Sequence, residues 1–292
     1  MAYYICIRRI TDPFVLAGSH EPIRSRRETR VSRLKANFGP QPGELDLPPG
    51  FEAVTLRELG DAFVHARKIA AEGGAGTLVW VRRLDVVELA VVLEPDEPLS
   101  TARRAIYAVL DAAADALAAA APPETPITLR WPDTVLIDGG ILGGARLGWP
   151  DRAAEHAVPD WLVAGLVLRN VAPHVRVDTA VGGHPLDEPL VRGASLASAG
   201  FERLDGATLV SSFARHLMVQ ADRWQQDGFE PIGRDFLARL ETRKGELRGL
   251  DADGGLLVRQ MATARDVVRH DLHAALTAGP RWMDPRTQEP WL

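Results

Sequence analysis

The sequence predicts an α+β fold in which a mixed β-sheet is backed by helices and is followed by a small β element. Short runs rich in valine and leucine recur between residues 77 and 168, as in the strands of one sheet. An alanine-rich helical stretch at residues 100–121 lies among them and ends at Pro122 and Pro123. Two more strand-like runs follow Gly245, after two further helical segments.

The first 50 residues differ in composition from the rest. Residues 1–39 carry eight Arg or Lys against three Asp or Glu, whereas the remainder carries 26 against 36. Residues 39–50 are rich in proline and glycine, which is typical of a linker. The basic segment is compatible with a nucleic-acid-binding arm, a transit segment or an extension without a folded role. We favour the last, so we expect residues 1–50 to be poorly ordered and the compact domain to begin near Phe51.

Composition excludes several classes of protein. The acidic body is a poor surface for nucleic acid. No apolar run approaches the roughly 18 to 20 residues needed to cross a bilayer, so we predict no membrane span. A single cysteine, Cys6, excludes an intramolecular disulfide and a cysteine-built zinc site, and we expect no resident metal site. We therefore expect a cytoplasmic protein with neither nucleic-acid nor membrane partners.

Capping residues and glycines predict where the helices begin and end. Thr55 followed by Glu58 matches a capping box, and Gly73 with Gly74 ends the helix that would follow it. Gly228 is the expected C-terminal cap of a later helix. The predicted helices cover residues 56–72, 100–121, 207–226, 232–242 and 263–276.

The expected strands are short and apolar. Those of the main sheet are predicted at residues 77–82, 86–93, 127–131, 135–137, 142–147 and 161–168. Asp138, Gly139 and Gly140 predict a tight turn between the fourth and fifth. Two later strands, at residues 246–250 and 256–260, predict a separate element. The expected domains are therefore residues 51–244 and residues 245–292, the second being the small element with its terminal helix.

The segment from Arg130 to Gly144, RWPDTVLIDGGILGG, resembles the signature of biotin protein ligases. In that family a Lys-Trp-Pro-Asn-Asp strand turns into Lys-Leu-x-Gly-Gly/Ile. The strand at residues 161–168, which contains Gly165, resembles the family's Val-x-Gly-x-Gly-x-Asn strand. The segment from Gly245 to Val258 resembles the start of the SH3-like barrel that closes many of these ligases. Residues 55–260 thus resemble the biotin/lipoate protein ligases, which implies their fold.

The resemblance also implies a chemistry. These enzymes activate biotin, lipoate or octanoate with ATP and then pass the acyl group to a lysine of a carrier domain. Holding a carboxylate against a triphosphate requires cations and N–H donors, which the family supplies from a Gly-Arg-Gly-rich loop and a lysine after the Trp-Pro hairpin. This chain has Glu72-Gly-Gly-Ala-Gly76 where we expect the loop. Where we expect the lysine it has Ile141, or Gly140 if the alignment shifts by one residue. Because loss of one such donor costs ~10²–10³ in rate, we expect ATP and Mg²⁺ to be little used.

Three residues are candidates for catalysis. Arg130 is either an anion ligand in place of the family's strand lysine or a surface arginine. Asp133 either accepts a hydrogen bond from a ligand or holds Mg²⁺, or else it caps a turn. Lys68, on the first predicted helix, is either a catalytic cation or part of a solvated helix face.

The candidate ligand-binding residues combine the glycines with the Trp-Pro motif. Trp131 and Pro132 form either a pocket wall or part of the core. Gly143 and Gly144 either let a ligand approach the backbone or mark a strand bulge. The full set is Gly73, Gly74, Gly76, Arg130, Trp131, Pro132, Asp133, Gly143, Gly144 and Gly165.

Two functions of different classes remain open. The first is an acyl-protein ligase, or an ATP-independent acyltransferase, in which Arg130, Arg82 or Arg146 replaces the missing lysine. The second is a protein that binds a small-molecule carboxylate, namely biotin, lipoate or octanoate, or a biotinyl or lipoyl carrier domain, without adenylation. Both imply an acyl pocket on the same scaffold.

Overall fold

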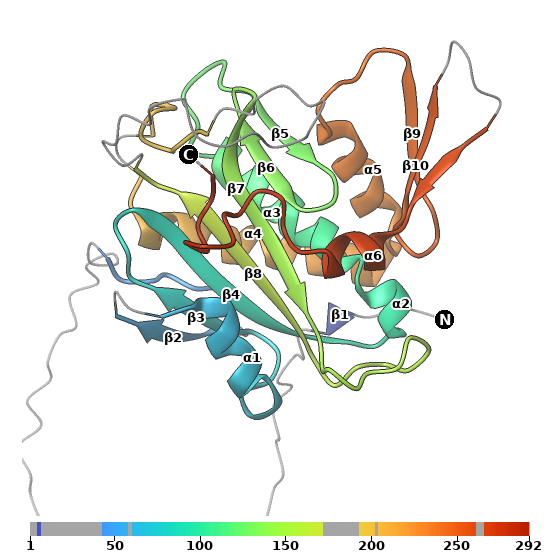
Figure 1. Ribbon diagram of the computed structural model, residues 1–292. Coiled ribbons are helices and arrows are strands. Elements are labelled where there is room, and N and C mark those ends of the chain that lie inside the picture. Colours follow the sequence, from blue (N-terminus) through green and yellow to red (C-terminus); the bar gives the residue numbers. More distant parts are fainter. Residues whose placement is uncertain are drawn as a thin grey trace, which may run out of the picture.

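In the computed structural model, residues 5–6, 43–57, 60–171, 193–201, 204–260 and 266–291 are described. These residues form an eight-stranded sheet, helices on both of its faces, and a separate three-stranded sheet (Figure 1). The α+β fold predicted from the sequence is confirmed.

The main sheet has the strand order β2-β3-β4-β8-β7-β6-β5, and β1 pairs with β4. Its strands are β1 (Ile5–Cys6), β2 (Glu52–Leu56), β3 (Thr77–Val81), β4 (Val86–Pro95), β5 (Ile127–Arg130), β6 (Thr134–Ile137), β7 (Gly140–Gly148) and β8 (Leu162–Arg169). The β2–β3 pair is parallel and the other pairs are antiparallel, so the sheet is mixed. The predicted strands between residues 77 and 168 are confirmed, with ends that shift by one or two residues. Asp138 and Gly139 both have positive φ, as the predicted turn requires.

Helices cover the two faces of this sheet differently. We call the face that packs against α1 (Ala62–Gly73) the front face. The back face packs against α3 (Ala105–Ala118) and α4 (Gly206–Asp227), with α5 (Glu230–Arg239) beside them. Most of the hydrophobic core therefore lies behind the sheet.

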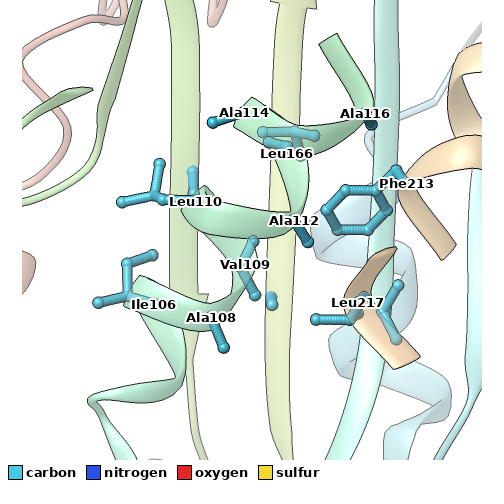
Figure 2. Close-up of a cluster of buried hydrophobic side chains, with 14 of the residues drawn as sticks. Ile106, Ala108, Val109, Leu110, Ala112, Ala114, Ala116, Leu166, Phe213 and Leu217 are labelled. Atoms are coloured by element: carbon cyan, nitrogen blue, oxygen red, sulfur yellow. The ribbon is translucent and has the colours of Figure 1, made fainter. Parts of the chain in front are cut away.

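Alanines let α3 approach its neighbours closely. Ala108, Ala112 and Ala116 are buried on this helix, and the large side chains of Phe213 and Leu217 on α4 pack beside it (Figure 2). The single helix predicted at residues 100–121 is divided in two, because tight i→i−3 hydrogen bonds at residues 103–107 separate α2 (Leu99–Ala102) from α3.

The first predicted helix begins later than expected. Thr55 lies in β2, opposite Trp80 of β3, and the helix starts after Asp61, whose Oδ1 accepts a hydrogen bond from Val64 N at 2.9 Å. The capping-box prediction was wrong at Thr55 because pairing with a distant strand outweighed the local pattern; Glu58 lies outside the described residues.

The small C-terminal sheet has the order β11-β10-β9. Its strands β9 (Glu246–Leu250) and β10 (Leu256–Gln260) are confirmed, and β11 (Val268–His270) adds a third. The prediction of a helix at residues 263–276 was wrong, because Leu256 pairs with His270 and helix α6 (Leu272–Thr277) begins only after the cap Asp271. After α6 the chain returns to the main sheet, rather than staying with the small element.

Parts of the expected N-terminal extension contact the folded body. Ile5 and Cys6 pair with Pro95 and Glu94, and Asp46 N donates to Ser211 Oγ at 3.0 Å. Leu45 also packs against the core. These segments differ from the unattached linker that we expected, because backbone pairing and apolar burial extend to them; residues 7–42 lie outside the described part.

Across the described ranges, no helix has both the length and the apolar character to cross a membrane.

A core substitution in α4 tests this packing. Phe213→Ala should lower the free energy of unfolding by about 3–5 kcal/mol, because it leaves a cavity beside α3. Val219→Ala, at a position of the same helix that is 51% exposed, should change it by less than about 0.5 kcal/mol. Urea unfolding of both variants measures the difference, and equal losses would contradict the packing described here.

Candidate functional site

Strand alternation sets the residues of the front face. Leu162, Ala164, Leu166 and Leu168 of β8 face the back-face core, which leaves Gly165, Val167 and Arg169 on the front. Val167 lies opposite Glu88 of β4 and Gly144 of β7, and Gly165 lies opposite Arg146. The front face therefore combines glycines with charged side chains at the middle of the sheet.

The N-terminus of α1 closes one side of this face. Ala62 N donates to Glu88 Oε1 at 2.7 Å, so a buried carboxylate of the sheet occupies the positive end of the helix. Burial raises the pKa of Glu88. A Cβ on Gly165 would lie 2.8 Å from Phe63 Cδ2, so this glycine makes room for the Phe63 ring.

Arginines surround the same face. Arg146 Nη2 lies 3.1 Å from Asp61 Oδ1, its guanidinium lies 4.6 Å from the centre of the Phe63 ring, and its Nε has no hydrogen-bond partner among the described residues. Arg83, in the β3–β4 turn, pairs with Asp85 and with Glu289, and these hydrogen bonds raise its pKa.

Arg169 is the most buried of these arginines, at 3% exposed. It donates to the Pro290 carbonyl oxygen, and its Nε makes no hydrogen bond within the described chain. Burial lowers the pKa of Arg169 because the charged form loses hydration. A buried guanidinium with unused donor capacity favours an anion as its partner.

A hairpin covers the other side of the front face. Residues 281–291, which we call the 281–291 hairpin, fold back on themselves through the Met283–Pro290 bridge and the hydrogen bond from Trp291 N to Trp282 O at 3.0 Å. Figure 1 shows this red segment lying across β7 and β8. Trp282 is fully buried, and its Nε1 donates to Ala145 O at 3.3 Å.

The indole of Trp282 lies directly on Gly144. A Cβ at position 144 would lie 2.2 Å from the backbone oxygen of Asp133 and 2.5 Å from the indole, so both contacts require glycine there. Ile141, Val167 and Met283 complete the apolar cluster around the indole. The residue at the expected lysine position is therefore buried in hydrocarbon.

Asp133 is buried at the edge of this site, at 3% exposed. Burial raises its pKa to about 7, although a hydrogen bond from Thr134 and the charge of Arg281 partly offset the shift. A carboxyl group with this pKa can donate or accept a proton at neutral pH. Asp133, one of the three candidate catalytic residues, therefore lies next to the hairpin, near Arg281.

The other motif residues take part in different contacts. Arg130 forms a two-pronged ion pair with Glu241, through Nε at 2.7 Å and Nη2 at 2.8 Å. Trp131 Nε1 donates to Tyr107 Oη at 2.9 Å, and its ring lies 5.9 Å from that of His270 in the small sheet. These contacts join the main sheet to the segment that follows α5, to α3 and to the small sheet. Pro132, joined to Trp131 by a cis peptide, is buried.

The glycine loop after α1 lies apart from these residues. Ala75 N donates to Glu94 Oε1 at 3.2 Å, and a Cβ on Gly76 would lie 1.9 Å from Gly50 O. Glu94 is six residues along β4 from Glu88, which corresponds to ~20 Å at 3.3 Å per residue. Gly73, Gly74 and Gly76 thus serve a backbone turn that already holds a carboxylate.

Two further predicted residues, Lys68 and Gly143, have positions that the local structure explains. Lys68 is exposed on α1. A Cβ on Gly143 would lie 2.0 Å from Val167 O, and Gly143 pairs with Val135 beside a β-bulge. The described residues contain no cluster of His, Cys, Asp or Glu that could hold a metal.

Sequence reasoning missed Arg83, Glu88, Trp282 and Glu289. The Arg82-Arg83 pair at a strand end could have indicated a site residue, because two adjacent arginines in a tight turn concentrate positive charge there. The hairpin residues carried no local signal, because their contacts join positions more than 130 residues apart.

The pH dependence of stability tests the environment of Asp133. Because its folded-state pKa is raised to about 7, the fold favours the protonated acid, and wild-type stability should fall as pH rises from about 4 to about 7. The Asp133→Asn side chain stays neutral, so the variant should not lose stability in this way as pH rises. Relative to wild type, it should gain about 2–4 kcal/mol between pH 4.5 and pH 8 in urea unfolding. Asp138→Asn, on the exposed turn, is the control, and a pH-independent difference for Asp133→Asn would contradict this environment.

Known proteins are similar to this chain in sequence or in fold. A curated biotin–[acetyl-CoA-carboxylase] ligase of Paracoccus denitrificans is 28% identical over 241 residues, covering 74% of this chain and 88% of that one. A biotin protein ligase-like protein of unknown function from Silicibacter sp. TM1040 superposes with a TM-score of 0.65 at 25% identity, covering 79% of this chain and 98% of that one. The biotin protein ligase of Aquifex aeolicus gives 0.58 at 14% identity, with coverages of 75% and 95%.

A sequence model of the biotin/lipoate A/B protein ligase family matches residues 47–238. The match spans both α1 with the front face and the core behind it. This chain belongs to the biotin/lipoate A/B protein ligase family.

Proposed function

We propose that the chain binds a small carboxylic acid of the biotin, lipoate or octanoate type on its front face, and that it activates this acid with ATP weakly or not at all. The observation that carries the second part is the burial of Ile141. Only 6% of it is exposed, and it packs with Val167 and Trp282 where the resemblance calls for a lysine. A hydrocarbon side chain there offers no stabilisation to a phosphate.

Family membership and two relatives support the choice of ligand. The Paracoccus denitrificans relative is named as a biotin ligase of acetyl-CoA carboxylase, and the Aquifex aeolicus enzyme has been solved in complex with biotin and ATP. Arg169, buried and with an unused Nε, supplies a site for the carboxylate of such an acid.

The charges of the front face oppose a bound triphosphate. Arg83 and Arg146 are each paired with acidic groups of the chain, and Glu88 is buried between them. Glu88 accepts from Ala62 N and lies 3.7 Å from Arg83 Nη1, so it already draws on the positive charge that a triphosphate would need. Arg83 therefore has little capacity left for ATP, and Arg146 contributes only its Nε, which has no partner among the described residues.

Acyl transfer without ATP is the competing function. It is favoured by Asp133, whose pKa of about 7 suits proton exchange with the lysine of a biotinyl or lipoyl carrier domain. In that case an acid already activated elsewhere would be the donor, and the carrier domain would be the partner.

Two assays run side by side test the proposal. ATP–pyrophosphate exchange with biotin, lipoate and octanoate should be at background, whereas calorimetry should detect binding of at least one acid. Arg169→Gln should weaken that binding at least tenfold, because it removes a buried cation. Arg234→Gln, an exposed arginine on α5, should leave the affinity within twofold.

The outcomes separate the parts of the proposal. Robust pyrophosphate exchange would show that the site activates acids after all. Binding of none of the three acids would eliminate the acyl site. Acyl transfer from an activated donor to a carrier domain, abolished by Asp133→Asn, would favour the competing function.

A further inference from the structure

The 281–291 hairpin contacts the front face with two chemically different groups. One is the indole of Trp282, whose Cδ1 and Nε1 lie against the backbone at Gly144. The other is the carboxylate of Glu289, which pairs with Arg83. The two groups reach the same face from one short segment.

The indole packs against the backbone at Gly144. A Cβ there would lie 2.2 Å from the backbone oxygen of Asp133 and 2.5 Å from the indole Nε1. The same nitrogen donates to the carbonyl oxygen of Ala145 at 3.3 Å. An N–H-bearing ring therefore rests on glycine and is held by the backbone of β7.

Oxygen atoms of the hairpin pair with the arginines beside that ring. Glu289 places its carboxylate on Arg83, and the adjacent Pro290 carbonyl accepts from Arg169. Arg169 is only 3% exposed while the hairpin is in place. An external carboxylate would compete with the Pro290 oxygen at Arg169, and with Glu289 and Asp85 at Arg83.

We propose that the 281–291 hairpin is an internal occupant of the acid-binding site, and that a ring-bearing carboxylic acid binds by displacing it. This inference rests on the function proposed above. The hairpin places a ring against Gly144 and a carboxylate on Arg83. Biotin and lipoate each also contain a ring and a carboxylate. The acid binds only molecules in which the hairpin has left the face. The apparent Kd is therefore the intrinsic Kd divided by the fraction of such molecules.

The construction of the hairpin allows it to leave as a unit. Its own hydrogen bonds, Asp284 N to Glu289 O and Gln288 N to Asp284 O, both 2.8 Å, do not involve the main sheet. Pro285, Arg286, Thr287 and Gln288 at its tip are exposed. Undocking therefore breaks the contacts of Trp282, Met283, Glu289 and Pro290 with the face and preserves the rest.

The first test weakens the hairpin's hold without touching the face. Glu289→Gln removes the carboxylate that pairs with Arg83, so calorimetry with biotin, lipoate and octanoate should give an affinity about tenfold tighter than that of the wild-type chain for the acid that binds. Glu230→Gln, the same substitution on exposed α5, should leave the affinity unchanged.

The second test follows the hairpin in the wild-type chain. Hydroxyl-radical footprinting read by mass spectrometry should label Trp282 and Met283 more strongly at saturating acid, while Trp224, buried behind the sheet, serves as the internal reference. If an acid binds but Glu289→Gln has wild-type affinity, or Trp282 stays protected, the inference is overturned and the proposed function stands. If no acid binds either chain, both the proposed function and this inference are overturned.

Discussion

The alternation of side chains along β8 is the constraint on which the site depends. Leu162, Ala164, Leu166 and Leu168 must all face α3 and α4, so Gly165, Val167 and Arg169 must face the front. A slip of one residue would expose four apolar side chains and bury the Arg169 guanidinium in the core. The apolar burial that stabilises the domain therefore also places the Arg169 guanidinium and the backbone at Gly165 on the same face of the sheet.

Charge pairing decides what that face can accept. Arg83 and Arg146 are partnered by acidic groups of the chain, whereas the described hydrogen bond of Arg169 is to a carbonyl oxygen. One buried cation suits a single carboxylate better than a triphosphate, which carries several charges. The same pairing makes the hairpin part of the electrostatics of the site, because Glu289 supplies one of the negative charges.

Local signals predicted the fold well and long-range contacts poorly. The strands between residues 77 and 168 and the turn at Asp138 followed from apolar runs and turn residues. The start of α1 did not, because Thr55 pairs with Trp80 in a parallel strand that a capping pattern cannot reveal. In the site, Asp133 was named from its motif, but the role of Trp282 on Gly144 joins residues 138 positions apart and leaves no periodic trace. Arg130 and Trp131 were named from the same motif, and the structure engages them with Glu241 and Tyr107 instead.

We propose that the glycine-lined front face, with Arg169 beside it, is the ligand site and that the 281–291 hairpin fills it. A crystal structure of the full chain with a bound acid tests this most directly. The account predicts the ligand's ring above Gly144, its carboxylate on the guanidinium of Arg169 or Arg83, and the indole of Trp282 displaced from β7. An acid bound elsewhere, with Trp282 still donating to Ala145 O, would contradict it.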